Sequence, residues 1–201
     1  MAGLEEVRRA LEGSLDREEA LREAAIGSSR SLVRECRRAI SSMVQSESPC
    51  DERAILGQAR PILEMAAKEK GADPGLFEDA LMELSEALVL SRVLDGAELP
   101  LPSEAGITER AYALGLCDAV GELRRMVLNR LLRGEREAAL AMYGTMRDLF
   151  GTVEGLTYPS GMLPLKRKQD IVRGVLERTA GELAVSLAVR APIGASREEA
   201  E

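Results

Sequence analysis

Apolar residues recur at intervals of three and four positions along most of this 201-residue sequence, which is the spacing of an amphipathic α-helix. Start and stop signals divide the pattern into seven predicted helices. A short first helix begins at Leu4 and is expected to end at Gly13. A capping box formed by Asp16 and Glu19 then begins a long second helix that reaches Gln45.

The other five predicted helices are bounded by proline, glycine and N-cap residues. Asp51 is expected to cap a third helix that Pro61 kinks, and Asp73 with Pro74 begins a fourth helix that ends near Gly96. The predicted ranges of the third, fifth, sixth and seventh helices are 51–70, 108–134, 135–153 and 164–192, and 97–106 is the longest internal loop. We therefore predict one helical domain over residues 1–192 and a polar, frayed tail over 193–201.

The composition agrees with a protein built of helices. Apolar residues make up 45% of the chain and charged residues 30%, which is typical of a globular protein. Aromatic residues are only 2% and tryptophan is absent, so side chains that favour β-strands are scarce. The fold class predicted from these observations is all-α, as a single-domain bundle of seven helices.

Histidine is absent, which excludes several kinds of catalytic and metal site. Neither a Ser-His-Asp nor a Cys-His mechanism is available, and a zinc site that needs imidazole cannot form. The three cysteines, Cys36, Cys50 and Cys117, are far apart and include no Cys-x-x-Cys pair. Two of them fall within apolar helical patterns, so we expect buried free thiols and a reducing compartment.

The sequence carries no signal for a membrane or for export. No apolar run is long enough to cross a bilayer, and the residues after Met1 do not resemble a signal peptide. With the cysteine pattern, this predicts a cytoplasmic protein.

The chain is acidic overall but contains two local clusters of basic residues. The net charge of −7 argues against non-specific adhesion to nucleic acid. Only four of the 27 basic residues are lysines, and arginine is the better bidentate partner for phosphate, although codon bias is the simpler explanation of the excess. The default interpretation of each local cluster of basic residues is a solvated helix face. The clusters are Arg30, Arg34, Arg37 and Arg38, and Lys166, Arg167 and Lys168.

Two pairs of carboxylates lie on the fourth and fifth predicted helices. Glu83 and Glu86 are three positions apart and therefore share a face, which leucines and alanines otherwise occupy. A buried carboxylate there needs a cation, a hydrogen-bond partner or a proton. Asp118 and Glu122 are four positions apart on a face that is polar.

The residues leave two interpretations of these carboxylates open. If the two helices pack antiparallel, the pairs converge into a set of oxygen ligands of the kind that Mg²⁺ or Mn²⁺ prefers. Alternatively, they form ion pairs with arginines such as Arg124 and Arg125, or they are solvated. Spacing alone favours this second interpretation for Asp118 and Glu122, and it is weaker for Glu83 and Glu86.

Several stretches of the sequence resemble the translin family, which comprises translin and translin-associated factor X. The most specific is 112–125 (YALGLCDAVGELRR), which is similar to the family's Tyr-Leu-x-Gly-x-x-Asp-x-x-Gly-Glu-Leu-x-Arg segment. The run 81–87 (LMELSEA) is similar to the helix of translin-associated factor X that contains Glu-x-x-Glu-Ala. Residues 28–40 resemble the family's basic early helix. Residues 165–170 and 187–190 resemble its last helix.

The resemblance implies a seven-helix fold and an oligomeric, usually octameric, hollow particle that binds single-stranded RNA or DNA. It also implies the metal-dependent endoribonuclease activity of subunits like translin-associated factor X. The residues that match its catalytic acids are Glu83, Glu86 and Asp118, with Glu122 as the fourth carboxylate and metal ligand. The chain is shorter than eukaryotic members and strongly acidic, so we expect a prokaryotic or archaeal homo-oligomer in which every subunit carries this set.

The working hypothesis is cleavage of single-stranded RNA by water that Mg²⁺ or Mn²⁺ activates. The basic clusters at 30–38 and 166–168 would guide the strand. Single-strand binders often stack bases on aromatic side chains, but this chain has only three tyrosines, and Tyr112 is expected to pack in the core. Two alternatives are a non-catalytic shell for single-stranded nucleic acid and a helical scaffold without a role in nucleic-acid binding.

Overall fold

The computed structural model describes residues 3–68 and 75–188. Within these ranges every regular element is an α-helix, and there is no strand. The seven helices are α1 (Gly3–Ser46), α2 (Glu52–Lys68), α3 (Gly75–Asp95), α4 (Pro102–Ala105), α5 (Glu109–Leu132), α6 (Arg136–Glu154) and α7 (Lys166–Ala188). The prediction of an all-α fold is confirmed.

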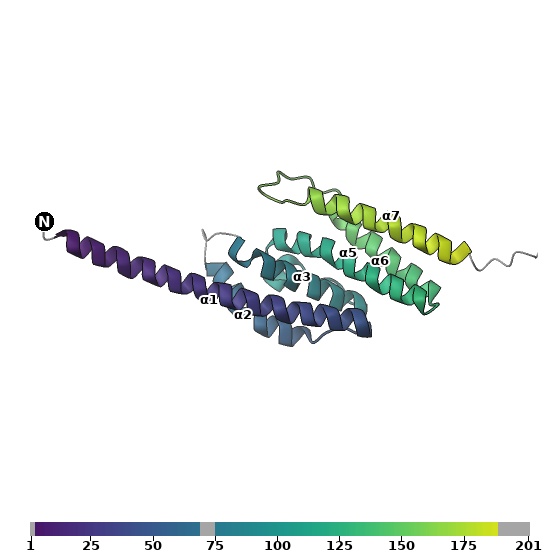
Figure 1. Cartoon of the computed structure of the whole chain (residues 1–201), viewed down its shortest axis with the longest axis horizontal. Helices are drawn as coiled ribbons and strands as arrows, with labels where there is room; N and C mark the ends of the chain where they lie inside the picture. The colour runs from purple at the N-terminus through teal and green to yellow at the C-terminus, as the bar shows by residue number, and fades with distance from the viewer. Residues whose placement is uncertain (1–2, 69–74, 189–201) are drawn as a thin grey trace, which may run out of the picture.

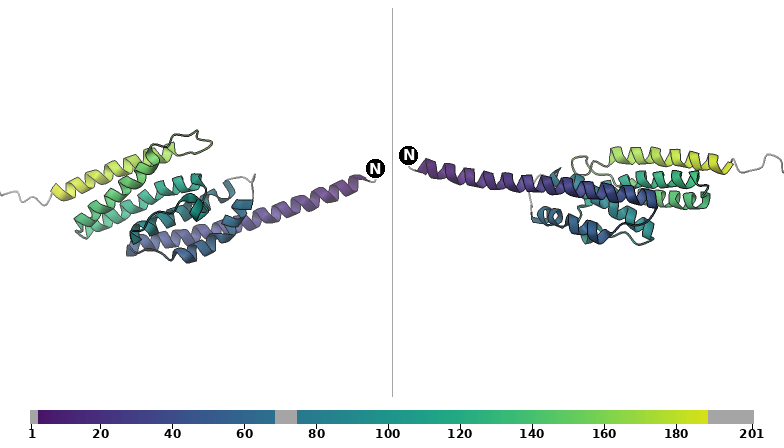
Figure 2. Two further views of the ribbon diagram at one scale, coloured as in Figure 1. Left: turned by 180° about the vertical axis from the view of Figure 1, so that it is seen from behind. Right: turned by 60° about the horizontal axis from the view of Figure 1, so that its bottom comes forward.

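Helix α5 lies at the centre of the bundle. It contacts α1, α3, α4, α6 and α7, and α1 with α2 covers the opposite face of α3 (Figures 1 and 2). Half of the residues of α5 are buried, on more than one face, because a helix with neighbours on several sides needs apolar residues around its circumference. The order of the layers therefore places α3 and α5 side by side.

The first 46 residues differ from the prediction of two helices. Helix α1 is continuous over 44 residues and passes through Gly13, so neither a stop at Gly13 nor a capping box at Asp16 is present. A glycine inside a helix costs about 1 kcal/mol relative to alanine, and the surrounding leucine, alanine, glutamate and arginine residues favour the helix strongly enough to continue it. The N-terminal half of α1 extends away from the bundle as an arm (Figure 1).

Two further boundaries differ in detail. The predicted loop at 97–106 contains the short helix α4, so the total of seven agrees with the prediction although the elements differ. Helix α7 begins at Lys166, after Pro164. The predicted start at Asp73 and Pro74 and the predicted tail at 193–201 lie outside the described residues.

Other predicted signals are present as expected. The Thr108 side chain accepts a hydrogen bond from the backbone N–H of Ala111 at 3.3 Å, and Asp51 accepts one from Ala54 at 3.1 Å. Helix α2 continues through Pro61, and the kink predicted there stays a prediction. N-cap side chains satisfy backbone donors that have no partner in the first turn of a helix, which is why these boundaries were readable locally.

Candidate metal and nucleic-acid site

Four carboxylates from two adjacent helices line one pocket of about 430 Å³. Glu83 and Glu86 come from α3, and Asp118 and Glu122 come from α5. Because α3 packs directly against α5, acids on the facing sides of the two helices reach the same space. Lys168 of α7 lies on the wall of the same pocket.

Small side chains allow α3 and α5 to approach closely beside the pocket. Ser85 is fully buried, and its hydroxyl donates a hydrogen bond of 3.3 Å to the backbone carbonyl of Tyr112. This contact is adjacent in sequence to Glu86 and draws that part of α3 against α5. The Tyr112 ring is itself buried, and its hydroxyl donates to the Pro100 carbonyl at 2.7 Å, which confirms that it packs in the core.

Glu86 is the most buried of the four acids, with 9% of its surface exposed. No hydrogen bond or ion pair joins its carboxylate to any other residue of the described part of the chain. The pKa of Glu86 is raised from 4.5 to about 8. Burial is the largest cause, and the negative charges of Asp118, Glu83 and Glu122 add to it, whereas the positive charge of Lys168 lowers the pKa. Near neutral pH, this carboxyl therefore holds a proton in the arrangement described.

The other three carboxylates are paired with cations. Arg37 on α1 donates to Glu83 from Nε at 2.8 Å and from Nη2 at 2.7 Å. Arg125 donates to Glu122 at 2.8 Å, and the Lys168 ammonium donates to both carboxylate oxygens of Asp118. Ion pairing, the second interpretation of the sequence, is therefore the observed geometry for three of the four acids.

The arginines that pair with these acids are not all those that the sequence suggested. Arg124 instead contacts Glu182 of α7 at 2.8 Å, and the Thr179 hydroxyl at 2.6 Å. Glu83 is paired with Arg37, a residue of the basic cluster that the family resemblance assigned to nucleic-acid binding.

The chemistry of the pocket fits a hard divalent cation, but the present pairing does not assemble its ligands. Carboxylate oxygens are the donors that Mg²⁺ and Mn²⁺ select, and Glu86 is a buried carboxylate without a partner in the described chain. No group of three or more acidic or cysteine side chains among residues 3–68 and 75–188 has the arrangement of a metal site. A metal ion that takes oxygens of the three paired acids as ligands would compete with these cations.

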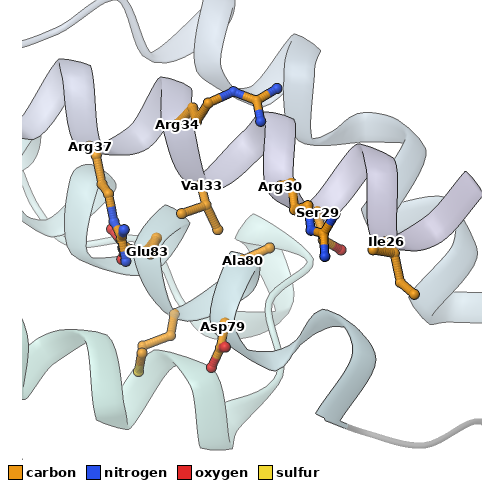
Figure 3. A pocket seen from close by; sticks show the side chains of 10 residues that line it. Ile26, Ser29, Arg30, Val33, Arg34, Arg37, Asp79, Ala80 and Glu83 are labelled. Carbon is orange, nitrogen blue, oxygen red and sulfur yellow. Dashed lines mark hydrogen bonds and ion pairs between the residues drawn. The ribbon is translucent and has the colours of Figure 1, made fainter. Parts of the chain in front are cut away.

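A basic groove of about 580 Å³ lies between α1 and α3, beside the carboxylate pocket. Arg30, Arg34 and Arg37 line it from α1, and Glu83 lies on the walls of both the groove and the carboxylate pocket. Figure 3 shows the Arg37 guanidinium directed at Glu83. Arg38 is not on this wall, because it pairs with Glu35 at 2.7 Å on the exposed side of α1.

The basic run at the start of α7 points in different directions. Lys166 is 79% exposed and pairs with Asp170 at 3.0 Å, and both Lys166 and Arg167 line a hollow that also contains Tyr158. Only Lys168 is turned toward the carboxylates. The working hypothesis assigned these three residues to guiding the nucleic-acid strand, and it did not predict that Lys168 would join the acids. One signal was available: Lys168 is four positions before Val172, a buried residue on the same face.

The state of the cysteines agrees with the prediction of buried free thiols. All three cysteines are free, and Cys36 and Cys117 are buried. Burial raises the pKa of Cys117 to about 11, so its thiol stays protonated although it lines the carboxylate pocket. None of the described helices has the length and apolar character needed to cross a membrane.

Comparison with known proteins connects this arrangement to a family. The sequence model of the Translin family matches residues 76–190, which include all four acids and Lys168. An uncharacterized protein of Methanocaldococcus jannaschii is 29% identical over 175 residues, covering 84% of this chain and 78% of that protein.

Solved structures are also similar to this chain over most of its length. The crystal structure of AfC3PO superposes with a TM-score of 0.74 at 28% identity, covering 93% of this chain and 98% of that one. A complex of AfC3PO with duplex RNA gives a TM-score of 0.76 at 27% identity, covering 93% and 97%. The fold is also that of apo-NeC3PO, with a TM-score of 0.76 at 19% identity and coverage of 89% and 96%.

Proposed function

Because this chain belongs to the translin family, we propose that it binds RNA in the groove between α1 and α3 and cleaves it at the carboxylate pocket with Mg²⁺ or Mn²⁺. One observation carries the proposal. Glu83 lies on both walls, so an RNA backbone held by the arginines of the groove would pass directly beside the acids. Contiguity of this kind is what an enzyme needs to hold a phosphodiester next to its reactive groups.

Glu83, Glu86 and Asp118 would hold the metal ion, and Glu122 would complete or orient the ligand set. A divalent cation in such a site polarises a phosphoryl oxygen and lowers the pKa of bound water, which supplies a nucleophile at neutral pH. Glu86 would release its proton when it becomes a ligand, because only the carboxylate form coordinates. The protein thus supplies oxygen ligands and a partly enclosed pocket.

The arginines would hold the strand by charge. Arg30 and Arg34 are exposed on one face of α1 and can donate to phosphate oxygens, while Arg37 is also bound to Glu83. Lys166 and Arg167 give a second exposed basic position at the start of α7. Since the described aromatic side chains are few, binding would be mainly electrostatic and strongly dependent on salt.

The proposed substrate is RNA, in either its single-stranded or its duplex form. The family resemblance favours single strands, whereas the complex of AfC3PO contains duplex RNA. Contacts to phosphate alone do not separate the two, because both present the same charged backbone. Single-stranded and duplex RNA therefore belong in every binding and cleavage assay.

We further propose a homo-oligomer, with the eight subunits that the family suggests as the number to test. The arm of α1 supports assembly, because Leu4, Val7, Leu11 and Leu15 form an apolar stripe with exposures of 67%, 55%, 58% and 61%. A stripe of this kind on a helix that leaves its own bundle is typical of a surface that another chain covers. The three free cysteines suit a reducing cytoplasm.

A second candidate function is non-catalytic RNA binding. The observation in its favour is that three of the four acids are already neutralised by Arg37, Lys168 and Arg125. In that case, the carboxylates would orient basic side chains for RNA, and no metal would be needed.

One experiment separates the two candidates. Purified protein is incubated with labelled single-stranded or duplex RNA in Mg²⁺, Mn²⁺ or EDTA, beside the variants Asp118→Asn and Glu86→Gln. Glu182→Gln is the matched control, because it removes a carboxylate that pairs with Arg124 and is not on the pocket wall. Cleavage that needs metal and both pocket acids supports the nuclease. Binding without cleavage supports the second candidate, and neither binding nor cleavage excludes both.

A further inference from the structure

Lys168 connects three helices at the carboxylate pocket. Its stem rises from the first turn of α7, and its ammonium donates to both oxygens of Asp118 on α5. The same nitrogen lies 3.5 Å from the sulfur of Met82 on α3. This ammonium therefore occupies the junction where the two pairs of acids face one another.

The environment of Lys168 distinguishes it from the other cations around the acids. It is the one basic side chain on the described wall of the pocket, and its side chain is 27% exposed. Arg37 and Arg125, which neutralise Glu83 and Glu122, are 69% and 60% exposed and reach in from solvent. Charge pairs that are shielded from water interact more strongly than exposed ones, so Lys168 is the principal cation inside the pocket.

Asp118 cannot serve Lys168 and a metal ion equally. Both of its oxygens already accept from the ammonium, and a divalent cation bound to either oxygen would place two positive centres next to each other. The lysine stem has four rotatable bonds, so the ammonium can leave Asp118 without a change in the backbone.

We propose that Lys168 is a built-in competitor of the metal ion, whose ammonium occupies Asp118 and must leave it before a divalent cation binds. The inference rests on the proposed function, since it assumes that Asp118 is a metal ligand. It assigns Lys168 a role in setting metal affinity, distinct from contact with RNA phosphate. Removal of the Lys168 charge then strengthens metal binding in the absence of RNA.

The test is calorimetric titration of the full-length protein with Mn²⁺, without RNA. Lys168→Met, which keeps the apolar stem and removes the charge, is expected to bind Mn²⁺ about fivefold more tightly than the wild type, the size of effect typical of a partly exposed ion pair. Lys168→Arg keeps the charge and is expected to bind as weakly as the wild type. Asp118→Asn is expected to bind more weakly than either.

Lys166→Met is the matched control. It removes the same charge from the same turn of α7, but Lys166 is 79% exposed and pairs with Asp170. An equal gain in both methionine variants would show an effect of net charge and would overturn the inference. Circular dichroism checks each fold, and Lys168→Gln, with the same expected gain, replaces Lys168→Met if that variant does not fold.

The possible results separate this inference from the function on which it rests. Wild-type binding that depends on Asp118, with no gain in Lys168→Met, overturns the inference and leaves the metal site in place. Absence of Mn²⁺ binding in every variant overturns both. Binding by Lys168→Met alone supports the inference, because it shows that the lysine keeps the metal out.

Discussion

Gly115 on α5 and Ser85 on α3 approach so closely that a Cβ atom added to Gly115 would lie 2.7 Å from the Cβ and Oγ atoms of Ser85. The same added atom would lie 2.7 Å from the Met82 carbonyl oxygen. Ser85 precedes Glu86, and Gly115 is one helical turn before Asp118. This contact therefore controls the distance between the acids of the two helices.

Gly115→Ala is expected to destabilise the fold by about 1–3 kcal/mol, because the added methyl group must push a backbone carbonyl and a buried side chain apart. Gly121→Ala, on the same helix, is the control, since its Cβ would have no atom within 4 Å. That change should increase stability by up to about 1 kcal/mol, because alanine favours a helix. Denaturant unfolding measures both, and equal effects would contradict the close contact.

Arg34→Ala is expected to weaken RNA binding and to reduce the slope of log Kd against log salt by about one. The reason is that Arg34 lies on the wall of the basic groove. Arg38→Ala removes the same charge four positions later, but Arg38 pairs with Glu35 and is not on that wall. Fluorescence anisotropy over a range of salt concentrations compares the two variants. A larger loss with Arg38→Ala would locate the RNA elsewhere.

Glu86→Gln is expected to make the metal-free protein more resistant to alkaline pH. The pKa of Glu86 is raised to about 8 from 4.5, so the unfolded chain releases this proton at a lower pH than the folded one. The resulting contribution to the free energy of unfolding is fully present below pH 4.5 and is lost as pH rises through about 8. Glutamine has no proton to release.

The difference in the free energy of unfolding between the Glu86→Gln variant and the wild type should therefore rise by on the order of a few kcal/mol from pH 4.5 to pH 9. Urea denaturation in EDTA at several pH values measures it. Parallel stability curves would show that Glu86 is not held in its protonated form.

Leu11→Glu is expected to shift the oligomer toward smaller species, because it places a charge within the apolar stripe of the α1 arm. Arg9→Gln is the control: it changes the net charge of the arm by the same amount, but on the opposite face of the helix. Light scattering after size-exclusion chromatography gives the mass of each. Dissociation by Arg9→Gln alone would rule out the stripe as the contact surface.

The fold class and much of the helix pattern were readable from the sequence. Capping by Thr108 and Asp51, and the glycine after α5, are local signals that involve residues within one turn of each other. The helix end predicted at Gly13 is wrong, because the cost of about 1 kcal/mol for a glycine inside a helix is smaller than the summed helix propensity of its neighbours. Helix α4 was missed because it is only four residues long.

The sequence by itself determined that Glu83 and Glu86 share a face and that Glu86 is buried, because both follow from positions within one helix. Only the tertiary structure decided their partners. Arg37 is 46 positions from Glu83, and Lys168 is 50 positions from Asp118. Helical periodicity relates residues a few positions apart, whereas the side chains that meet across the pocket are selected by how α1, α3, α5 and α7 pack.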